Sequence, residues 1–311
     1  MGILKYFSGE RLVHLSMACF VLVSSVGLSL INKKMVVPSS PIAIRAYDIS
    51  KLPILGETNS FPIISSQGAI AVDMESGVTL YEKNSDQPLL PASTTKILTA
   101  LTAMDYFPME AKLKIGRVRV EGQRIGLKEG EEYTFVNLLS GLLIYSGNDA
   151  AEVIAANYPG GREIFVTAMN MKAKSLHMDN SYFENPVGFD NYNHISTAKD
   201  MVRLARIAME NPIFANIVNT KEVTITDISG KSIFKLENTN KLLGTVFGVK
   251  GVKTGWTENA RENLVTVIER DGHKVMIAVL GSQDRFGETK ELIDWIFANY
   301  NWQEVKISYS P

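Results

Sequence analysis

The stretch PASTTKILTA, residues 91–100, decides how this 311-residue chain is interpreted. In it Ser93 precedes Lys96 by three residues, so a helix that begins here brings the two side chains together. An ordinary helix start explains this spacing equally well. The chain contains three such pairs, Ser93–Lys96, Ser196–Lys199 and Ser232–Lys235. The surrounding sequence therefore has to separate them.

Local pattern weakens two of the three pairs. Ser232 and Lys235 lie in a predicted strand, where side chains three residues apart point to opposite faces. Ser196 precedes an amphipathic helical segment. The simpler interpretation there is that Ser196 or Thr197 caps the helix and that Lys199 is solvated on its first turn.

The helix that Ser93 opens has different surroundings. Residues 97–104 contain no charged side chain, and their large apolar residues recur at helical spacing. Lys96 is therefore a lone charge at the start of a buried face, where desolvation lowers the pKa of an ammonium group. A neutral lysine can take a proton from serine without a histidine. The free amides of the helix start also favour negative charge developing near Ser93.

Two further segments carry polar groups at structural boundaries. Ser146-Gly-Asn148 lies between a predicted apolar helix and the next one, and its glycine permits close approach of the backbone to a partner. Ser146 can pass on a proton, and Asn148 can both donate and accept hydrogen bonds. Lys253-Thr-Gly255 directly precedes an apolar strand, and a strand with this pattern can bind an anionic group along its edge.

Composition excludes several classes of function. The formal net charge is −1 and no long basic run is present, which argues against a nucleic-acid partner. The only cysteine is Cys19, so there is neither a disulfide framework nor a cysteine metal cluster. The four histidines are scattered without ligand spacing. We therefore expect no metal and no cofactor.

The N-terminal segment predicts export. Residues 12–31 contain no Asp, Glu, Lys or Arg. A helix of this length is about 30 Å long, which is enough to cross the hydrocarbon core of a bilayer. Lys5 and Arg11 precede the segment, as in an N-terminus that stays in the cytoplasm. It is either an uncleaved anchor or a signal peptide cut near residues 25–27. Both alternatives place the rest of the chain on the extracytoplasmic side of the membrane.

The remaining pattern predicts an α+β fold. Segments 68–73 and 78–83 form one hairpin signal, and 222–226 with 232–236 and 264–268 with 275–280 form two more. Between them lie helical segments over 93–104, 135–144, 150–156, 162–176 and 197–209, and a closing helix follows over 285–300. We expect an antiparallel β-sheet made from both halves, flanked by helices, with a helical insert. The expected domains are an anchor or signal peptide over 1–31, a Pro-rich linker over 32–62 and a catalytic domain over 63–306.

Taken in order, Ser-x-x-Lys, Ser-x-Asn and Lys-Thr-Gly are the motif set of penicillin-binding proteins and serine β-lactamases. Longer segments over about residues 66–300, among them VTLYEKNSDQPLLPASTTKILTALTA and GVKTGWTENARENLV, extend the match. The chain resembles low-molecular-weight penicillin-binding proteins of the serine-type D-Ala-D-Ala carboxypeptidase family. The order of the motifs selects Ser93, because Ser196 and Ser232 follow Ser146. The resemblance implies a β-lactamase/transpeptidase-like fold.

The resemblance also implies roles for the proton-transfer residues. Ser93 is the acylated nucleophile, and Lys96 is its general base, with a pKa that the charge of Lys253 helps to lower. Ser146 relays the proton to the leaving D-alanine. Asn148 orients Lys96 and the substrate amide.

The strand motif is implied to hold the substrate. Lys253, Thr254 and Thr257 bind the terminal carboxylate, and Gly255 gives clearance. The backbone amides of Ser93 and Trp256 form the oxyanion hole. The implied partners are a peptidoglycan stem peptide that ends in D-Ala-D-Ala, β-lactams as inhibitors, and the membrane through the N-terminal segment.

Three alternatives stay open beside the carboxypeptidase. A D,D-endopeptidase uses the same motifs on peptidoglycan cross-links. A β-lactamase needs a Glu-x-x-Leu-Asn-like segment, which SYFENPVGFD at residues 181–190 does not provide. The third alternative is a non-catalytic peptidoglycan-binding protein. The intact Ser93, Lys96 and Lys253 argue against it, because binding alone does not require a nucleophile.

Overall fold

The computed structural model of the chain describes residues 51–57 and 60–304. The predicted anchor or signal peptide over 1–31 lies outside these residues, as does most of the predicted linker. Among the helices of the described part, none combines the length and the apolar character that a bilayer crossing requires.

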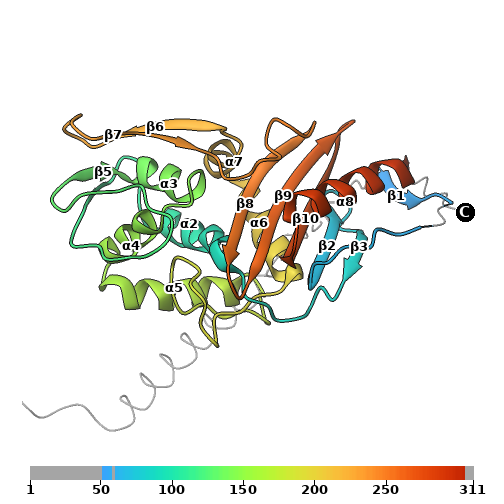
Figure 1. The fold of residues 1–311 in the computed structure, drawn as a ribbon, viewed down its shortest axis with the longest axis horizontal. Coiled ribbons are helices and arrows are strands. Elements are labelled where there is room, and N and C mark those ends of the chain that lie inside the picture. The colour runs from blue at the N-terminus through green and yellow to red at the C-terminus, as the bar shows by residue number, and fades with distance from the viewer. Residues whose placement is uncertain (1–50, 58–59, 305–311) are drawn as a thin grey trace, which may run out of the picture. The chain divides into compact units, whose positions relative to one another are not determined.

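A five-stranded antiparallel sheet forms the core of the described chain (Figure 1). Its strands are, in spatial order, β3 (Thr79–Lys83), β2 (Gly68–Asp73), β10 (His273–Ser282), β9 (Arg261–Arg270) and β8 (Val249–Thr257). The N-terminal hairpin β2–β3 joins the C-terminal strands through the β2–β10 pair. This confirms the expected sheet made from both halves of the chain.

Both faces of the sheet are covered, which explains the nearly continuous apolar runs of its central strands. Along β10, Met276, Ala278 and Leu280 belong to the core cluster that includes residues of α6 (Ala198–Glu210). The alternate residues Val275, Ile277 and Val279 belong to a second cluster with residues of α8 (Arg285–Asn299). Alternation along one strand thus supplies both cores.

The helical insert packs beside this sheet (Figure 1). It contains the short 3-10 turn η1 (Ala92–Thr95) followed by α2 (Lys96–Met104), α3 (Phe135–Leu143), α4 (Asn148–Asn157), α5 (Gly161–Ser175) and α7 (Pro212–Val218). Two small hairpins accompany it, β4 (Lys112–Lys114) with β5 (Glu132–Thr134) and β6 (Glu222–Thr226) with β7 (Ile233–Glu237). Helix α2 is buried along nearly its whole length, as its uncharged sequence predicts.

Part of the predicted Pro-rich linker, residues 51–55, forms a strand. Strand β1 (Lys51–Leu55) pairs antiparallel with β11 (Tyr300–Glu304), which begins where the predicted closing helix has its last residue. Pro53 is compatible with this strand, because a two-stranded pair has only edges, where proline is tolerated. Trp302 fastens β11 by stacking on His273 at 4.4 Å and by donating to Asp73 Oδ1 at 2.9 Å.

Candidate active site

Ser93 lies in a turn that two glycines clamp. The 3-10 turn η1 carries it immediately before α2, and Ala92 adopts a left-handed φ of 47°. A Cβ on Gly188 would overlap the carbonyl of Ala92, and one on Gly255 would come within 2.9 Å of the Pro91 oxygen. Only glycine therefore lets the flanking segments pack this closely against the serine turn.

Lys96 reaches Ser93 from the first turn of α2. Its side chain is fully buried, and Nζ lies 2.9 Å from Ser93 Oγ. The same nitrogen donates to Asn148 Oδ1 at 2.7 Å and to the carbonyl oxygen of Val187 at 2.8 Å. Three segments that are distant in sequence thus converge on one lysine nitrogen.

Burial lowers the pKa of Lys96 to about 7, and the charges of Asp149 and Glu152 partly oppose this effect. The sequence attributed part of the lowering to Lys253, but desolvation is the principal cause here. The repulsion between the two lysines lowers the pKa of Lys253 instead. Its pKa lies well below the usual value because of burial first, and then because of the charges of Lys96 and Arg285.

Asn148 connects Lys96 with the neighbouring loop. It is the first residue of α4, where its backbone N–H donates to the carbonyl of Gln123 at 2.8 Å and its Nδ2 donates to the carbonyl of Glu121 at 2.7 Å. Ser146, two residues earlier, has a left-handed φ of 66° and is buried. The strained turn brings Ser146 and Asn148 to the same cavity.

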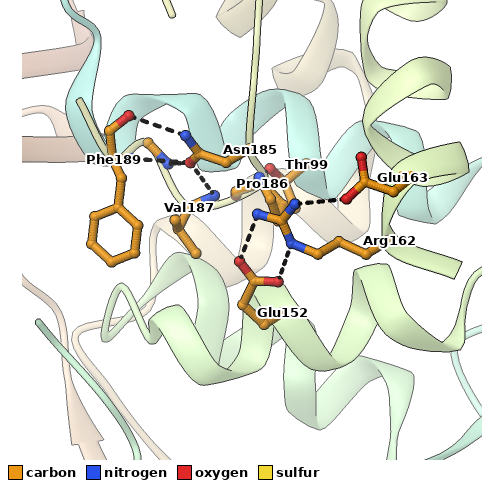
Figure 2. A network of polar contacts seen from close by, with 9 residues as sticks. Thr99, Glu152, Arg162, Glu163, Asn185, Pro186, Val187 and Phe189 are labelled. Atoms are coloured by element: carbon orange, nitrogen blue, oxygen red, sulfur yellow. Dashed lines mark hydrogen bonds and ion pairs between the residues drawn. The ribbon is translucent and has the colours of Figure 1, made fainter. Parts of the chain in front are cut away.

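Asn185, to which the sequence assigned no role in the site, organises the loop over residues 185–189 (Figure 2). Its Oδ1 accepts from the amides of Val187, Gly188 and Phe189 at 3.2, 2.8 and 3.0 Å. Thr99, from α2, donates to the carbonyl of Pro186 at 2.7 Å. These bonds hold the Val187 carbonyl against Lys96. The Asn-Pro-x-Gly pattern is a turn signal, but only the fold shows that it faces the lysine.

Strand β8 presents the Lys-Thr-Gly motif along the other wall. Lys253 is fully buried and donates to the carbonyl of Thr254 at 3.0 Å. The Thr254 hydroxyl lies 2.7 Å from that of Thr239, whereas Thr257 donates to Asp190 Oδ1 at 2.7 Å. The hydroxyl of Thr257 is thus engaged by a carboxylate rather than free for a substrate anion.

These residues surround a cavity of about 660 Å³. Seven of the nine predicted site residues line it, namely Ser93, Ser146, Asn148, Thr254, Gly255, Trp256 and Thr257. The other two, Lys96 and Lys253, are fully buried. Trp256 is 60% exposed and so stands at the rim. The structure therefore brings the three sequence motifs to one place.

Arg285 is a lining residue that the sequence did not predict. It is the first residue of α8, and its Nη1 donates to the carbonyl of Gly255 at 2.8 Å. Its Nε is buried and has no hydrogen-bond partner among the described residues. A guanidinium at the wall of a cavity suits an anionic ligand. No motif marks Arg285, because the fold alone brings it beside Gly255.

The two other Ser-x-x-Lys pairs do not form a comparable site. Ser232 Oγ donates to Glu131, and Lys235 forms an ion pair with Glu222 at 2.9 Å. Ser196 Oγ lies 2.8 Å from Ser181 Oγ instead of contacting a lysine.

Comparison with known proteins gives a consistent picture. Residues 56–284 match the D-alanyl-D-alanine carboxypeptidase family, peptidase family S11. A D-alanyl-D-alanine carboxypeptidase of Bacillus subtilis is 34% identical over 246 residues, which make up 76% of this chain and 63% of that protein. A D-alanyl-D-alanine endopeptidase of Escherichia coli is 30% identical over 247 residues, 77% of this chain and 79% of its own.

Among solved structures, the DD-transpeptidase of Streptomyces K15 superposes with a TM-score of 0.73 at 31% sequence identity. The match covers 77% of this chain and the whole of that one. The family match extends over most of the described residues and contains all three motifs that meet at the cavity. This chain belongs to the D-alanyl-D-alanine carboxypeptidase family of serine peptidases.

Proposed function

We propose that the chain is a serine-type D-Ala-D-Ala carboxypeptidase that removes the terminal D-alanine from peptidoglycan stem peptides through an acyl-enzyme on Ser93. The observation that carries this proposal is the contact of 2.9 Å between Ser93 Oγ and Lys96 Nζ. The lysine is fully buried, and its pKa of about 7 leaves a large fraction neutral at physiological pH. A buried, neutral amine beside a serine hydroxyl is a general base beside a nucleophile.

The partners of Lys96 fix the direction of proton transfer. A neutral amine has two N–H donors and one lone pair. Asn148 Oδ1 and the Val187 carbonyl take the two donors, since both are acceptors. The lone pair then points to the Ser93 hydroxyl. Lys96 takes the hydroxyl proton while Oγ forms a bond to the carbonyl carbon of the scissile peptide.

The tetrahedral intermediate places negative charge on the former carbonyl oxygen. The backbone amides of Ser93 and Trp256 are the expected donors to that oxygen. The proton on Lys96 then passes through Ser146 to the nitrogen of the terminal D-alanine, and the C–N bond breaks. Water hydrolyses the Ser93 ester and releases the shortened peptide.

The wall formed by β8 and α8 is suited to the terminal carboxylate of the substrate. Arg285 and Thr254 both line the cavity there. Arg285 replaces Thr257 as the principal candidate, because the Thr257 hydroxyl is bonded to Asp190. A bound carboxylate at this wall places the preceding peptide bond near Ser93.

A D,D-endopeptidase is the second candidate function, because the Escherichia coli and Pseudomonas aeruginosa relatives are named D-alanyl-D-alanine endopeptidases. The β-lactamase alternative is weaker. Two glutamates, Glu121 and Glu258, are among the described residues that line the cavity, and both are exposed. A carboxylate that activates a deacylating water is expected to be enclosed beside the ester.

The chain is further proposed to act at the extracytoplasmic face of the membrane, held there by the apolar segment over 12–31. The support is the sequence of that segment together with a substrate that belongs to the cell wall. Antibody access to a tag at the C-terminus in intact spheroplasts tests this placement.

A labelling experiment tests the activity. The catalytic domain is incubated with a fluorescent penicillin and, separately, with a pentapeptide that ends in D-Ala-D-Ala. Ser93→Ala is expected to lose both labelling and D-alanine release, whereas Ser196→Ala, with the same motif, keeps both. Labelling that persists in Ser93→Ala would contradict the site. Labelling with cleavage of cross-linked dimers alone would identify an endopeptidase.

A further inference from the structure

A second cavity, of about 800 Å³, adjoins the candidate active site. Glu121 and Phe189 line both cavities, so the two share a wall. The second cavity is lined by four arginines, Arg117, Arg119, Arg124 and Arg162, and by the carboxylates of Glu121 and Glu152. We call it the arginine groove.

Most of the positive charge in the arginine groove is unpaired. Arg162 is the exception, since its Nε donates to Glu152 at 2.8 Å and its Nη1 contacts Glu163 at 3.3 Å (Figure 2). The other three arginines are exposed and form no ion pair with any residue that the structure describes. Only Glu121 then remains as an opposing charge. The groove is therefore a surface for anions, not an internal salt-bridge network.

The loop that carries these arginines is fastened to the catalytic residues. Asn148, which also holds Lys96, bonds the carbonyls of Glu121 and Gln123. Asp149 accepts from the amides of Ile125 and Gly126 at 3.0 and 2.8 Å. These bonds hold the backbone on both sides of Arg124 in place beside the residues that contact Ser93.

The two walls of the active-site cavity face different parts of the substrate peptide. Arg285 and Thr254 lie on the wall proposed for the terminal carboxylate, whereas residues 121–123 form the wall that continues into the arginine groove. A peptide bound with its last carboxylate at Arg285 therefore extends its preceding residues toward that groove.

We propose that the arginine groove binds free carboxylates in the part of the peptide that precedes D-Ala-D-Ala, so that the enzyme prefers acidic donor peptides over amidated ones. This inference rests on the proposed function. Guanidinium groups bind carboxylates in a bidentate geometry. Glu121 and Glu152 interrupt the positive surface. That arrangement suits a peptide with one or two separate carboxylates better than a polymer with a negative charge in every unit.

The test uses two peptides that end in D-Ala-D-Ala and differ only upstream, where one carries Glu and the other Gln. At low salt the wild-type enzyme is expected to hydrolyse the Glu peptide with a kcat/KM about tenfold higher, through KM. The triple variant Arg117→Gln, Arg119→Gln, Arg124→Gln should bring the ratio of the two kcat/KM values close to one. Salt at 0.5 M should reduce the wild-type ratio as well.

A matched control removes the same charge elsewhere. Lys174→Gln, Arg206→Gln, Lys231→Gln alters three exposed cations that line neither cavity, and it should keep the wild-type ratio. Equal kcat/KM values for the two peptides in the wild type would overturn the inference. Loss of the ratio in the control triple variant would overturn it too, since general charge would then explain the preference.

Binding separates this inference from the proposed reaction. The two peptides are titrated by fluorescence anisotropy against Ser93→Ala, which holds substrate without turnover. Tighter binding of the Glu peptide, lost on adding the three arginine substitutions, supports the groove even if the wild type releases no D-alanine. A groove that binds a glycerol-phosphate oligomer but does not discriminate the peptides would contradict it.

Discussion

Two regions of the molecule carry the same motif at the start of a helix, and only one of them has the features of a catalytic site. Lys96 is fully buried, and its nitrogen contacts Ser93 Oγ at 2.9 Å. The side chain of Lys199 is 47% exposed and pairs with Asp86 at 3.0 Å, away from its own serine. The two segments have the same spacing, but Ser93 lies in a 3-10 turn, whereas Ser196 and the cap residue Thr197 are extended. What differs is the tertiary environment of the lysine.

The environment acts through the partners it supplies. Lys96 donates to two acceptors, Asn148 Oδ1 and the Val187 carbonyl, and within residues 51–57 and 60–304 it forms no ion pair with a carboxylate. It can therefore lose its proton and keep its position. Lys199 instead contacts the carboxylate of Asp86 at the protein surface. A motif becomes catalytic when the fold removes water and counter-charge from its base.

The largest expected effect comes from removing each lysine in turn. Lys96→Met should lower the rate of penicillin acylation by about 10² to 10⁴, the usual contribution of a general base. Lys199→Met removes only an exposed ion pair and should change acylation little and stability by about 1 kcal/mol or less. Stopped-flow acylation measures the rates, and circular dichroism verifies that both variants are folded. Equal losses of acylation rate in the two variants would contradict the assignment of Lys96, rather than Lys199, as the general base.

The pH dependence of acylation sharpens the same distinction. The active form of Lys96 is the neutral amine, and its pKa is lowered to about 7. As pH falls below 7 the neutral fraction falls, so the acylation rate should drop about tenfold for each unit of pH. Above 7 the rate should level off. A β-lactam with no titrating group between pH 5 and 9 gives the profile, and a flat profile would exclude Lys96 as the base.

Sequence was sufficient where the signal is local or continuous. The hairpins of the sheet and the buried face of α2 follow from apolar periodicity, and Ser93, Lys96 and Asn148 follow from ordered motifs. Each of these signals is contained in a few neighbouring residues. The prediction of β2 as a strand is one example, and the structure confirms it over the residues expected.

Sequence was insufficient where distant segments decide. Arg285 reaches Gly255 because the turn from β10 into α8 places it beside β8 and β9, and Asn185 holds the loop of the Val187 carbonyl from a segment that looks like an ordinary turn. Strand β1 is short and contains Pro53, so its pairing with β11 has no periodic signature. Such contacts depend on packing between elements, which single-segment patterns do not encode.

His194 links the two compared regions and gives a third test. Its Nε2 lies 2.8 Å from Thr95 Oγ1, and its Nδ1 accepts from the amide of Glu184 at 3.1 Å. Burial lowers the pKa of His194 to about 4, so the folded state keeps it neutral while the unfolded state takes up a proton below about 6.5. The free energy of unfolding should therefore decrease as pH falls from 6.5 to 4, by about 2 kcal/mol at pH 5.

The non-titrating variant His194→Gln isolates this contribution. Urea unfolding of the wild type and the variant at pH 7.5 and 5.0 should show the extra loss of about 2 kcal/mol in the wild type only. If both proteins lose the same amount, other groups carry the pH dependence. That result would contradict the prediction that the buried, neutral His194 makes the protein less stable at low pH.

The smallest expected change in stability, that of Thr197→Ala, separates structure from chemistry at the two helix starts. Thr197 caps α6, since its Oγ1 accepts from the amide of Asp200 at 3.0 Å, whereas no side chain caps η1 or α2. Thr197→Ala should therefore cost about 1 kcal/mol of stability and leave penicillin acylation unchanged. Ser93→Ala should show the reverse, with acylation abolished and stability nearly unchanged. A thermal melt and an acylation assay on both variants compare them. A large stability loss in Ser93→Ala would mean that this serine caps its helix after all, and the two Ser-x-x-Lys regions would then differ less than their lysines suggest.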